Sequence, residues 1–426
     1  MKPFLTLQSV ESVLEHIRSF PVLEEEAVPL DAALGRRLAG SFAAPEALPG
    51  FDRATVDGFA VRARDVFGAQ EGSPALVECV ADCPMGVVPE VVLQEGQAAR
   101  ILTGGMLPQG ADCAVMVEYS RPAGGNLVEL TRSQAPGDNV ILRDDDAAAG
   151  DVLLQAGQRL RPQDLGLLAA FGVSGVGVRR RPRVAVLSTG DEVVPSAETP
   201  PPGKVRDVNA HSIAALCREA GADALRAGLV RDDAQALQAA VARLAQEYDV
   251  VAVSGGSSAG MRDHTVEIFA SLPQASLLVH GAAISPGKPF ILARSVMAGR
   301  VVALVGLPGH TTSALICARV FLAPLLAHLQ GGAVPETPAA LPAVLVRSVA
   351  SAQGRRDYLR VRLRALCGAE QERAAVAGLR PRYAAEPIMG ASGLISGMAA
   401  ADGLLVCPEN WEGYDAGELV MVELFR

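Results

Sequence analysis

Three polar loops in this chain have residue types and spacing suited to holding a phosphate group. The loop "SGGSSAG", residues 254–260, directly follows the apolar residues 250–253. Its glycines let backbone N–H groups approach an anion closely, and its serine hydroxyls add hydrogen-bond donors. A Gly-Gly pair by itself is as typical of an ordinary turn as of an anion site. The loops "STGDE", residues 188–192, and "GLPGH", residues 306–310, also follow apolar runs, and three such loops together favour the anion site.

Carboxylates lie beside these loops, at expected strand ends or helix starts. They are Asp191, Glu192, Asp232, Asp233 and Asp263. Taken singly, each is explained as a helix cap that offsets the helix dipole, and this explanation is best for Asp232 and Asp233, which begin an expected helix. Around a bound anion, however, several carboxylates would repel the ligand unless a cation lay between them. The set therefore indicates Mg²⁺ bridging carboxylate and phosphate oxygens, with Lys288 in "SPGKP" neutralising charge.

Alternating strands and helices beyond Arg183 must position these loops. We expect strands over residues 183–188, 222–230, 249–256 and 301–309, and helices over residues 209–221, 232–248 and 311–329. Asn209 is expected to cap the first of these helices, and Gly221 to end it. Such alternation implies right-handed crossovers and a mainly parallel sheet covered on both faces. Ligands of such sheets bind outside the carboxyl ends of the strands, so the three loops should line one crevice.

The rest of the chain has a different character. Leu7, Val10, Leu14 and Ile17 are spaced for one face of a helix that Pro21 would end. Short apolar runs broken by Gly and Pro between residues 41 and 140 predict a small β domain. A helix is expected over residues 161–173, a linker over residues 331–340, and a β-rich domain after it.

Composition limits the possible partners and the cellular location. The 426 residues carry a formal net charge of −9, and the pI is about 5.3, so no basic surface for a phosphate backbone is expected. The apolar runs are shorter than the roughly 20 residues that cross a bilayer, and the N-terminus lacks the apolar core of a signal peptide. Seven scattered cysteines without a Cys-x-x-Cys pair indicate free thiols. We expect a cytoplasmic protein that binds neither nucleic acid nor membrane.

An ordered series of motifs covers nearly the whole chain. It includes "LPGFDRATVDGFAVRARD", "ARILTGGMLPQGADCAVMVE", "STGDEV", "DVNA", "GLVRDD", "SGGSSAGMRDHT", "SPGKPF", "GLPGH", "GRRDYLRVRL" and "SGLISGMAAADGLLVCPE". In this order the motifs resemble those of the molybdopterin molybdenumtransferase family, the molybdenum insertases typified by bacterial MoeA and the gephyrin E domain. Each motif alone is weak, but the ordered series is highly specific.

The resemblance implies a fold and an assembly. The fold class is multidomain α/β plus β: a three-layer α/β domain with a mostly parallel sheet, an inserted small β domain, a split N-terminal helical and extended domain, and a C-terminal β barrel-like domain. The implied boundaries are 1–44 with 139–181 for the split domain, 45–138 for the inserted domain, 182–330 for the α/β molybdopterin-binding domain, 331–340 for the linker and 341–426 for the C-terminal domain. Family members form homodimers whose active site lies between the α/β domain of one subunit and parts of the other.

The resemblance also implies a reaction. The enzyme takes adenylylated molybdopterin (molybdopterin-AMP) and molybdate, cleaves the phosphoanhydride in a Mg²⁺-dependent step, releases AMP and leaves molybdenum on the dithiolene. A molybdopterin adenylyltransferase and downstream molybdoenzyme maturation proteins are the implied partners.

The family's functional positions map onto this sequence as follows. The implied catalytic residues are Asp57, Thr103, Glu192, Asp232, Asp263 and Lys288, of which Glu192, Asp232 and Asp263 would bind the metal. The implied cofactor-binding residues are Ser188, Thr189, Gly190, Ser254, Gly255, Gly256, Ser257, Pro308, Gly309, Arg355, Arg356, Ser392 and Ser396.

Two departures from the family pattern keep alternatives open. The usual Lys-Pro-Gly-Lys-Pro reads Ser285-Pro286-Gly287-Lys288-Pro289 here, and the usual Gly-Leu-Pro-Gly-Asn-Pro has His310 in place of Asn. Loss of the lysine should weaken capture of a dianion unless Arg355, Arg356 or His310 compensates. Besides an active insertase, the sequence therefore permits a non-catalytic paralogue that binds molybdopterin or serves as a scaffold. A molybdopterin nucleotidyltransferase is a third reading, disfavoured by Asp57, Thr103 and the four-domain layout.

Overall fold

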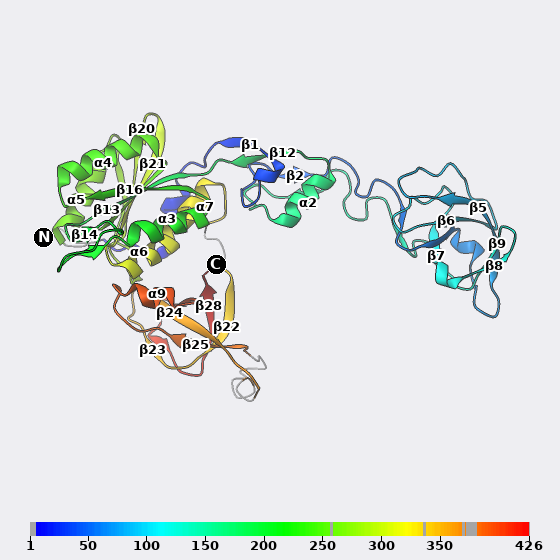
Figure 1. The fold of residues 1–426 in the computed structure, drawn as a ribbon. Coiled ribbons are helices and arrows are strands. Elements are labelled where there is room, and N and C mark those ends of the chain that lie inside the picture. Colours follow the sequence, from blue (N-terminus) through cyan, green and yellow to red (C-terminus); the bar gives the residue numbers. More distant parts are fainter. Residues whose placement is uncertain (1–5, 256–258, 335–337, 369–370, 372–380, 426) are drawn as a thin grey trace. The chain divides into compact units, whose positions relative to one another are not determined.

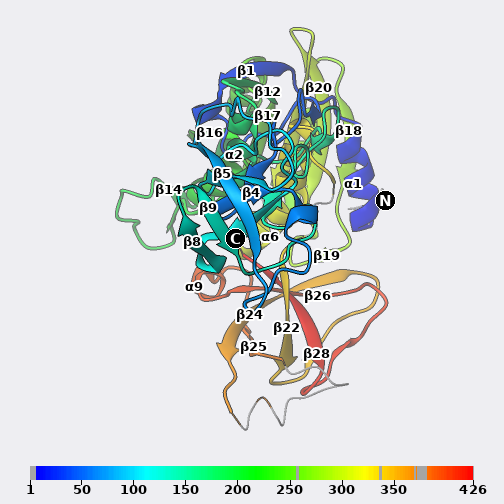
Figure 2. The same cartoon turned by 90° about the vertical axis from the view of Figure 1, so that its right-hand side faces the viewer.

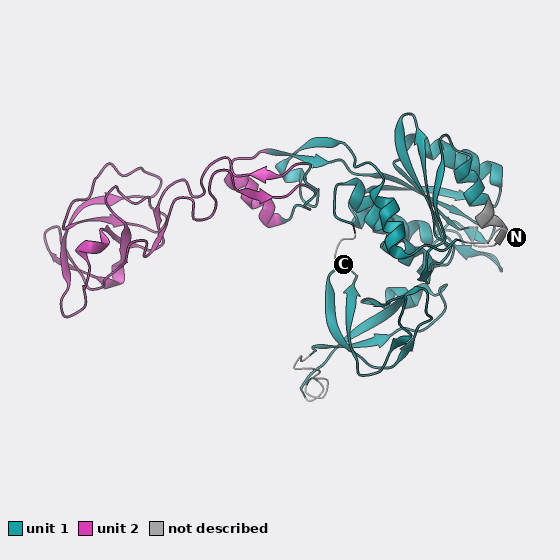
Figure 3. Ribbon diagram, turned by 180° about the vertical axis from the view of Figure 1, so that it is seen from behind, with its two compact units in different colours: residues 1–39, 157–161, 175–426 teal, residues 40–156, 162–174 magenta. Residues whose placement is uncertain are grey.

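The structure is a computed structural model that describes residues 6–255, 259–334, 338–368, 371 and 381–425, with residues 259–263 described by their backbone alone. The chain forms two compact units, coloured separately in Figure 3. Unit 1 comprises residues 1–39, 157–161 and 175–426, and unit 2 comprises residues 40–156 and 162–174. The four-domain boundaries stay a prediction, and each unit is described by itself.

A six-stranded sheet organises the α/β part of unit 1 (Figure 1). Its strands, in spatial order, are β16 (Asp223–Val230), β13 (Arg183–Thr189), β17 (Val250–Gly255), β21 (Arg300–Leu307), β20 (Ile291–Met297) and β18 (Ser276–His280). The pairings from β16 to β21 are parallel, which confirms the mostly parallel sheet. The strands β20 and β18 pair antiparallel and were not among the expected strands.

Helices cover both faces of this sheet. They are α1 (Val10–Arg18), α3 (Asn209–Glu219), α4 (Ala234–Glu247), α5 (Ala259–Ala270), α6 (Thr311–Cys317), the π-helical turn η4 (Ala318–Leu322) and α7 (Ala323–Leu329). Because side chains alternate along a strand, Val184 and Val186 face the core with α3, α6 and α7, while Ala185 and Leu187 face the core with α4 and α5. The sheet is thus the middle of three layers.

The helical run Thr311–Leu329 is a core element. Among the described helices it alone is long and apolar enough to cross a membrane, but 67% of its most apolar stretch is buried inside the fold. Its apolar composition is accounted for by packing on the sheet.

Two sequence-based expectations about helix starts are wrong. Helix α1 begins at Val10 because the Ser9 hydroxyl accepts a hydrogen bond from the Ser12 N–H, so Leu7 lies outside the helix and is exposed. Asn209 is not the N-cap of α3 but its first residue, and the Asp207 carboxylate accepts from the Ala210 N–H instead. The side chain of Asn209 is therefore left for other partners.

Smaller pieces complete unit 1. Strand β1 (Glu25–Pro29) pairs with β12 (Gly175–Arg179), the 3-10 turn η1 spans Leu30–Ala32, and β14 (Val193–Val194) pairs with β15 (Val205–Arg206).

A closed five-stranded barrel forms the C-terminal part of unit 1 (Figure 2). Its strands, in spatial order, are β24 (Arg356–Ala365), β25 (Tyr383–Pro387), β22 (Ala340–Leu345), β28 (Leu419–Leu424) and β26 (Gly403–Cys407), and pairing of β26 with β24 closes it. Strand β19 (Ile284–Ser285) extends from the α/β part and pairs with β24. Strands β23 (Val349–Ala350) and β27 (Gly413–Tyr414) and helix α9 (Ile395–Ala399) lie between the barrel strands in sequence.

Unit 2 contains a second six-stranded sheet with its own core. The strands, in spatial order, are β7 (Cys113–Met116), β4 (Gly58–Val61), β6 (Gln97–Ile101), β5 (Ala75–Cys83), β9 (Leu127–Leu130) and β8 (Ser120–Gly124). The remaining elements of unit 2 are the strands β2 (Phe42–Ala43), β3 (Arg53–Ala54), β10 (Val140–Ile141) and β11 (Val152–Leu154), the turns η2 (Ala63–Asp65) and η3 (Val117–Tyr119), and α2 (Pro162–Ala170).

A buried ion-pair network holds the amino ends of the central strands. The Asp249 carboxylate, 4% exposed, accepts hydrogen bonds from Arg180 at 2.6 and 2.9 Å and from the Arg183 N–H at 2.8 Å. Arg300 lies 3.3 Å away. Burial raises the pKa of Asp249, but the hydrogen bonds from Arg180 and the Arg183 N–H outweigh it and hold that pKa below its usual range.

We predict that Asp249→Asn lowers the free energy of unfolding by about 3 kcal/mol at pH 7, because it removes the buried carboxylate that accepts hydrogen bonds from Arg180, Arg300 and the Arg183 N–H. The folded-state pKa of Asp249 lies below the unfolded one, so its stabilisation is present above about pH 4 and is lost as pH falls through the folded pKa. Urea denaturation of wild type and variant at several pH values measures the difference, which should shrink below about pH 4.

Asp223→Asn is the matched control. Asp223 lies 3.9 Å from Arg181 in an exposed ion pair, and its removal should cost less than about 1 kcal/mol. Equal losses in the two variants would contradict the role assigned to the buried network.

Candidate active site

The expected polar loops of unit 1 meet at the carboxyl ends of β13, β17 and β21. In the sheet, Thr189 is the register partner of Gly255, and Ser254 is the partner of Leu307. The chain passes from β13 to β16 through α3 on one face and returns to β17 through α4 on the other. A crevice between β13 and β17 is the usual ligand site of such a topology.

Gly255 allows the close approach of the two strand ends. Its φ is +129°, and a Cβ built on it would lie 1.9 Å from the Thr189 carbonyl oxygen. No side chain fits at this position without moving backbone apart. The glycine that the sequence assigns to anion binding is therefore also required by packing.

Buried polar side chains gather on the α3 side of these strand ends. Ser188 and Ser254 are register partners, so their side chains lie on the same face of the sheet. The Asn209 Nδ2 donates to the Ser254 Oγ at 2.9 Å and to the Gly309 carbonyl at 2.8 Å. The Ser254 Oγ also lies 3.5 Å from the Pro308 carbonyl. The structure thus brings together the loops that end β17 and β21.

Three carboxylates, those of Asp191, Glu192 and Asp232, lie around the end of β13. The Thr189 hydroxyl donates to Asp232 at 3.1 Å, and the Asp232 N–H donates to Asp191 at 3.3 Å. The Glu192 carboxylate folds back on its own turn, where a Cβ built at Gly190 would lie 2.8 Å from its Oε2. Asp233 is confirmed as a helix cap, since its carboxylate accepts from the Gln235 and Ala236 N–H groups.

These donors fit a divalent cation only together with a substrate. Among the described residues, no three His, Cys, Asp or Glu side chains lie close enough to form a metal cage. Glu192 and Asp232 are nevertheless hard oxygen donors at one strand end, and Mg²⁺ is commonly held by one or two carboxylates plus substrate phosphates and water. The helix α5 carries Asp263, whose side chain lies outside the described part, as do Gly256 and Ser257. The metal site therefore stays a prediction.

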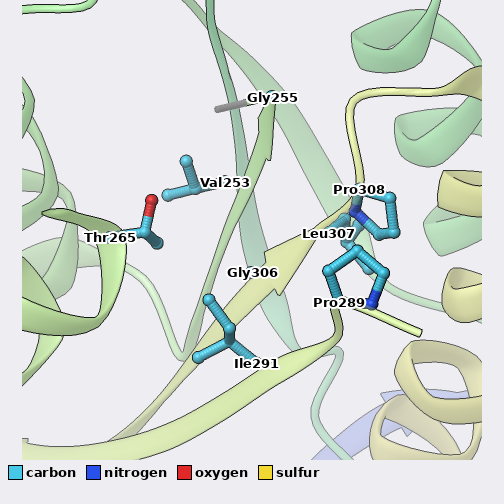
Figure 4. A pocket seen from close by; sticks show the side chains of 8 residues that line it. All are labelled: Val253, Gly255, Thr265, Pro289, Ile291, Gly306, Leu307 and Pro308. Carbon is cyan, nitrogen blue, oxygen red and sulfur yellow. The ribbon is translucent and has the colours of Figure 1, made fainter. Parts of the chain in front are cut away.

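A small cavity lies on the opposite face of β17 and β21 (Figure 4). It is lined by Val253, Gly255, Thr265, Pro289, Ile291, Gly306, Leu307 and Pro308. Its volume of about 10 Å³ accommodates about one water molecule. It is a packing gap behind the loops and is far too small for a nucleotide.

The C-terminal barrel contributes Ser392 to the third loop. The His310 Nδ1 and the Ser392 Oγ are 2.9 Å apart, and the Thr312 N–H donates to the Ser392 carbonyl at 3.0 Å. Ser396 lies nearby in sequence on α9 and is exposed. The family usually has Asn at the position of His310. His310 thus lies within hydrogen-bonding distance of Ser392, one of the residues expected to bind the cofactor.

The two neighbouring arginines have different surroundings. Arg356 pairs with Glu11 at 2.6 Å and with Glu409 at 2.9 Å, so its charge is used within the fold. Arg355 lies 3.2 Å from Asp357, and its side chain is 46% exposed. Ser285 is the register partner of Asp357, and Asp357 is the ion-pair partner of Arg355. The positive charge of Arg355 therefore lies close to Ser285.

Lys288 is exposed on the loop between β19 and β20. The neighbouring Gly287 carbonyl accepts a hydrogen bond from the buried Cys317 thiol at 3.2 Å, which anchors this loop to α6. Among the described residues, none forms an ion pair or side-chain hydrogen bond with Lys288, and its assignment stays a prediction.

Asp57 and Thr103 lie together in unit 2. The Asp57 Oδ1 accepts from the Thr103 N–H at 2.7 Å and from the Thr103 hydroxyl at 2.8 Å. These two bonds, the backbone one foremost, lower the pKa of Asp57 below its usual value. The pair that the sequence singled out therefore forms one ionised, exposed unit.

Comparison with known proteins assigns the chain to a family. Residues 8–172 match the MoeA N-terminal region (domain I and II), residues 185–328 a probable molybdopterin binding domain, and residues 342–425 the MoeA C-terminal region (domain IV). A molybdopterin molybdenumtransferase of Bacillus subtilis is 32% identical, over 95% of this chain and 90% of that protein. The chain belongs to the MoeA family.

Further relatives agree with this assignment. Molybdopterin molybdenumtransferase 2 of Mycobacterium tuberculosis is 34% identical, over 93% of this chain and 94% of that protein. A crystal structure of a MoeA protein from Pyrococcus horikoshii is similar at a TM-score of 0.77 and 34% identity, covering 99% of this chain and 100% of that one. The expectations of a MoeA-like multidomain fold and of a transferase of molybdenum cofactor biosynthesis are confirmed.

The residue that sequence reasoning missed in this MoeA-family site is Asn209. It was expected to cap a helix, whereas its side chain joins two loops. The available signal was its position in "DVNA", one of the ordered motifs, two residues after Asp207, which is able to cap the helix.

We predict that Gly255→Ala destabilises the fold by more than about 2 kcal/mol, since the new methyl group meets the Thr189 carbonyl. Gly228→Ala is the matched control. Gly228 lies in the same sheet at φ +103°, and a Cβ there has no atom within 4 Å, so that variant bears the backbone strain alone. Denaturant unfolding measures both, and equal losses would show that the contact with Thr189 is unimportant.

We predict that Thr103→Ala raises the pKa of Asp57 part of the way to its usual value. The Thr103 hydroxyl bond is lost, while the bond from the backbone N–H remains. A carboxyl-carbon NMR titration of the full chain measures the pKa. An unchanged pKa would mean that the backbone bond alone accounts for the shift.

Proposed function

We propose that this chain transfers molybdenum from molybdate to adenylylated molybdopterin, with cleavage of the phosphoanhydride and release of AMP in a Mg²⁺-dependent step. Membership of the MoeA family supports the substrate class. The observation that carries the proposal is the meeting of three polar loops and two carboxylates at the carboxyl ends of β13, β17 and β21.

The residues at the end of β13 would hold the divalent cation. Thr189 orients Asp232 by its hydroxyl, and Glu192 lies on the following turn. A bound Mg²⁺ would polarise the phosphoanhydride and offset the charge of the leaving AMP. Asp263 is proposed as a third ligand from α5. Without the cation, these carboxylates would repel the phosphates.

The loops after β17 and β21 would bind the substrate itself. Ser254 and Gly255 end β17, and Pro308 and Gly309 directly follow β21, where their backbone groups and the Ser254 hydroxyl would contact the substrate. Gly256, Ser257, Ser188, Thr189 and Gly190 are proposed to complete this cradle. Lys288, exposed on its loop, would neutralise phosphate charge.

Molybdate would be bound by hydrogen-bond donors and cations that differ from those of the family pattern. Ser285, in place of the family's lysine, lies beside Asp357 and its ion-pair partner Arg355. We propose that Arg355 supplies the cationic charge there, while Ser392 and His310 supply hydrogen-bond donors. Tungstate is nearly the same in size and charge as molybdate and would compete for the same donors.

The assembly and location follow the family pattern in this proposal. We propose a cytoplasmic homodimer in which Asp57 and Thr103 complete the active site. A molybdopterin adenylyltransferase would supply the substrate, and molybdoenzyme maturation proteins would receive the product. Neither nucleic acid nor membrane has a part in this proposal.

A non-catalytic paralogue is the second candidate, favoured by the loss of the lysine at Ser285. It would bind molybdopterin without turnover. The nucleotidyltransferase alternative is less well supported, because the chain matches the MoeA N-terminal and C-terminal regions as well as the molybdopterin-binding domain.

The deciding experiment measures AMP release from adenylylated molybdopterin with Mg²⁺, with and without molybdate. We expect release that molybdate stimulates, together with metal-loaded cofactor. Tight binding without release would replace the insertase by the paralogue. Formation of pyrophosphate from ATP and molybdopterin would favour the nucleotidyltransferase.

We predict that Arg355→Ala raises the molybdate concentration needed for half-maximal AMP release by about tenfold, because one charged donor is lost. Adding Ser285→Lys to that variant should lower the requirement again, since the lysine restores a cation beside Asp357. Arg364→Ala, further along the same strand and paired with Glu386, is the control and should change nothing. A normal requirement in Arg355→Ala would exclude the proposed compensation.

A further inference from the structure

Asn209 is the side chain that connects two of the three loops. It is the first residue of α3, and it is 8% exposed. One Nδ2 group donates to the Ser254 Oγ at the end of β17 and to the Gly309 carbonyl after β21. Both N–H bonds of the amide are therefore committed to loop atoms.

The two hydrogen bonds from Asn209 lie just beyond the point where backbone pairing between β17 and β21 ends. The register of β17 with β21 ends at Ser254 and Leu307. Beyond that point, Pro308 and Gly309 continue into the loop before α6. The remaining bond from Ser254 to this loop, to the Pro308 carbonyl, is long at 3.5 Å. Asn209 thus supplies the two shorter bonds that fix the loop spacing.

Helix capping does not explain the position of Asn209. The Asp207 carboxylate accepts from the Ala210 N–H at 3.0 Å, and the Asn209 side chain makes its bonds away from its own helix. An amide rather than a carboxylate is required, because the Gly309 carbonyl can only accept a hydrogen bond.

Unpartnered polar atoms lie around this amide. The Asn209 Oδ1, the Ser188 Oγ and the Thr312 Oγ1 are buried and have no hydrogen-bond partner within the described chain. Buried polar atoms left unpaired are costly and are usually satisfied by a ligand or by ordered water. Ser188 is the register partner of Ser254, so at least two of these groups border the same strand ends.

We propose that Asn209 is a positioning residue of this site: it sets the spacing of the Ser254 and Gly309 loops so that both contact the same substrate. It binds no metal and performs no proton transfer. The effect on turnover rests on the proposed function, whereas the effect on loop spacing does not.

The first experiment measures amide hydrogen exchange of the full chain without ligand. In Asn209→Ala we expect exchange in peptides covering residues 250–255 and 306–312 to rise by about tenfold, because two hydrogen bonds are lost. In Asn209→Asp the bond to the Gly309 carbonyl is lost, and we expect a similar rise in residues 306–312. Exchange in residues 183–187 should stay unchanged. Ser212→Ala is the control, since it removes hydrogen bonds to the Val208 and Asn209 carbonyls at the start of the same helix and none to the loops.

Two exchange results would overturn the proposal. If amide exchange becomes faster by the same factor throughout the sheet, Asn209 stabilises the whole fold and does not specifically position the loops. If both variants exchange at the wild-type rate, Asn209 does not position the loops. If neither Asn209 variant folds, Ser254→Ala removes one of the two acceptors and should accelerate exchange at the end of β17. Unchanged exchange there would also count against the proposal.

The second experiment separates binding from chemistry. With adenylylated molybdopterin as substrate, Asn209→Ala should raise KM about tenfold and lower kcat by less than about threefold. A fall in kcat with an unchanged KM would contradict a role in loop spacing. If wild type shows no turnover, the proposed function fails, but the exchange measurement still decides the role of Asn209.

Discussion

The pairing of β13 with β17 at their carboxyl ends is the constraint on which this site depends. Gly255 meets the Thr189 carbonyl so closely that only a residue without Cβ fits there. This approach aligns Ser188 with Ser254 on one face of the sheet and leaves the Thr189 hydroxyl beside Asp232. Backbone pairing thus places Ser188, Thr189 and Ser254, and side-chain hydrogen bonds then connect Thr189 to Asp232 and Ser254 to Asn209.

An ion-pair network lies at the other end of these strands. The Asp249 carboxylate accepts hydrogen bonds from Arg180, Arg300 and the Arg183 N–H at the amino ends of β13 and β17, where no ligand is expected. This network therefore lies at the end of the sheet opposite the carboxyl ends, where the site is expected. At the carboxyl ends, by contrast, several buried polar atoms lack partners within the described chain, as expected of a surface that binds a polar substrate.

The fold shows which residues contact the two positions where this sequence departs from the family pattern. His310 is not an isolated substitution, because it lies within hydrogen-bonding distance of Ser392 from the C-terminal barrel. Ser285 lies beside Asp357, whose charge is already balanced by Arg355. The two arginines that are adjacent in sequence differ in their surroundings: Arg356 pairs with Glu11 and Glu409, whereas Arg355 pairs with Asp357 and its side chain is 46% exposed.

The sequence alone determined the alternation of strands and helices, the glycine turns, the Asp233 cap and the ordered motifs of the MoeA family, because these depend on local periodicity and residue type. It missed the antiparallel β18 and β20, whose short apolar patterns do not encode strand direction. Only the tertiary structure decided the partners of Asn209 and Arg356. Those partners lie up to 345 residues away along the chain, and a side chain's choice among distant partners depends on packing that local sequence does not specify.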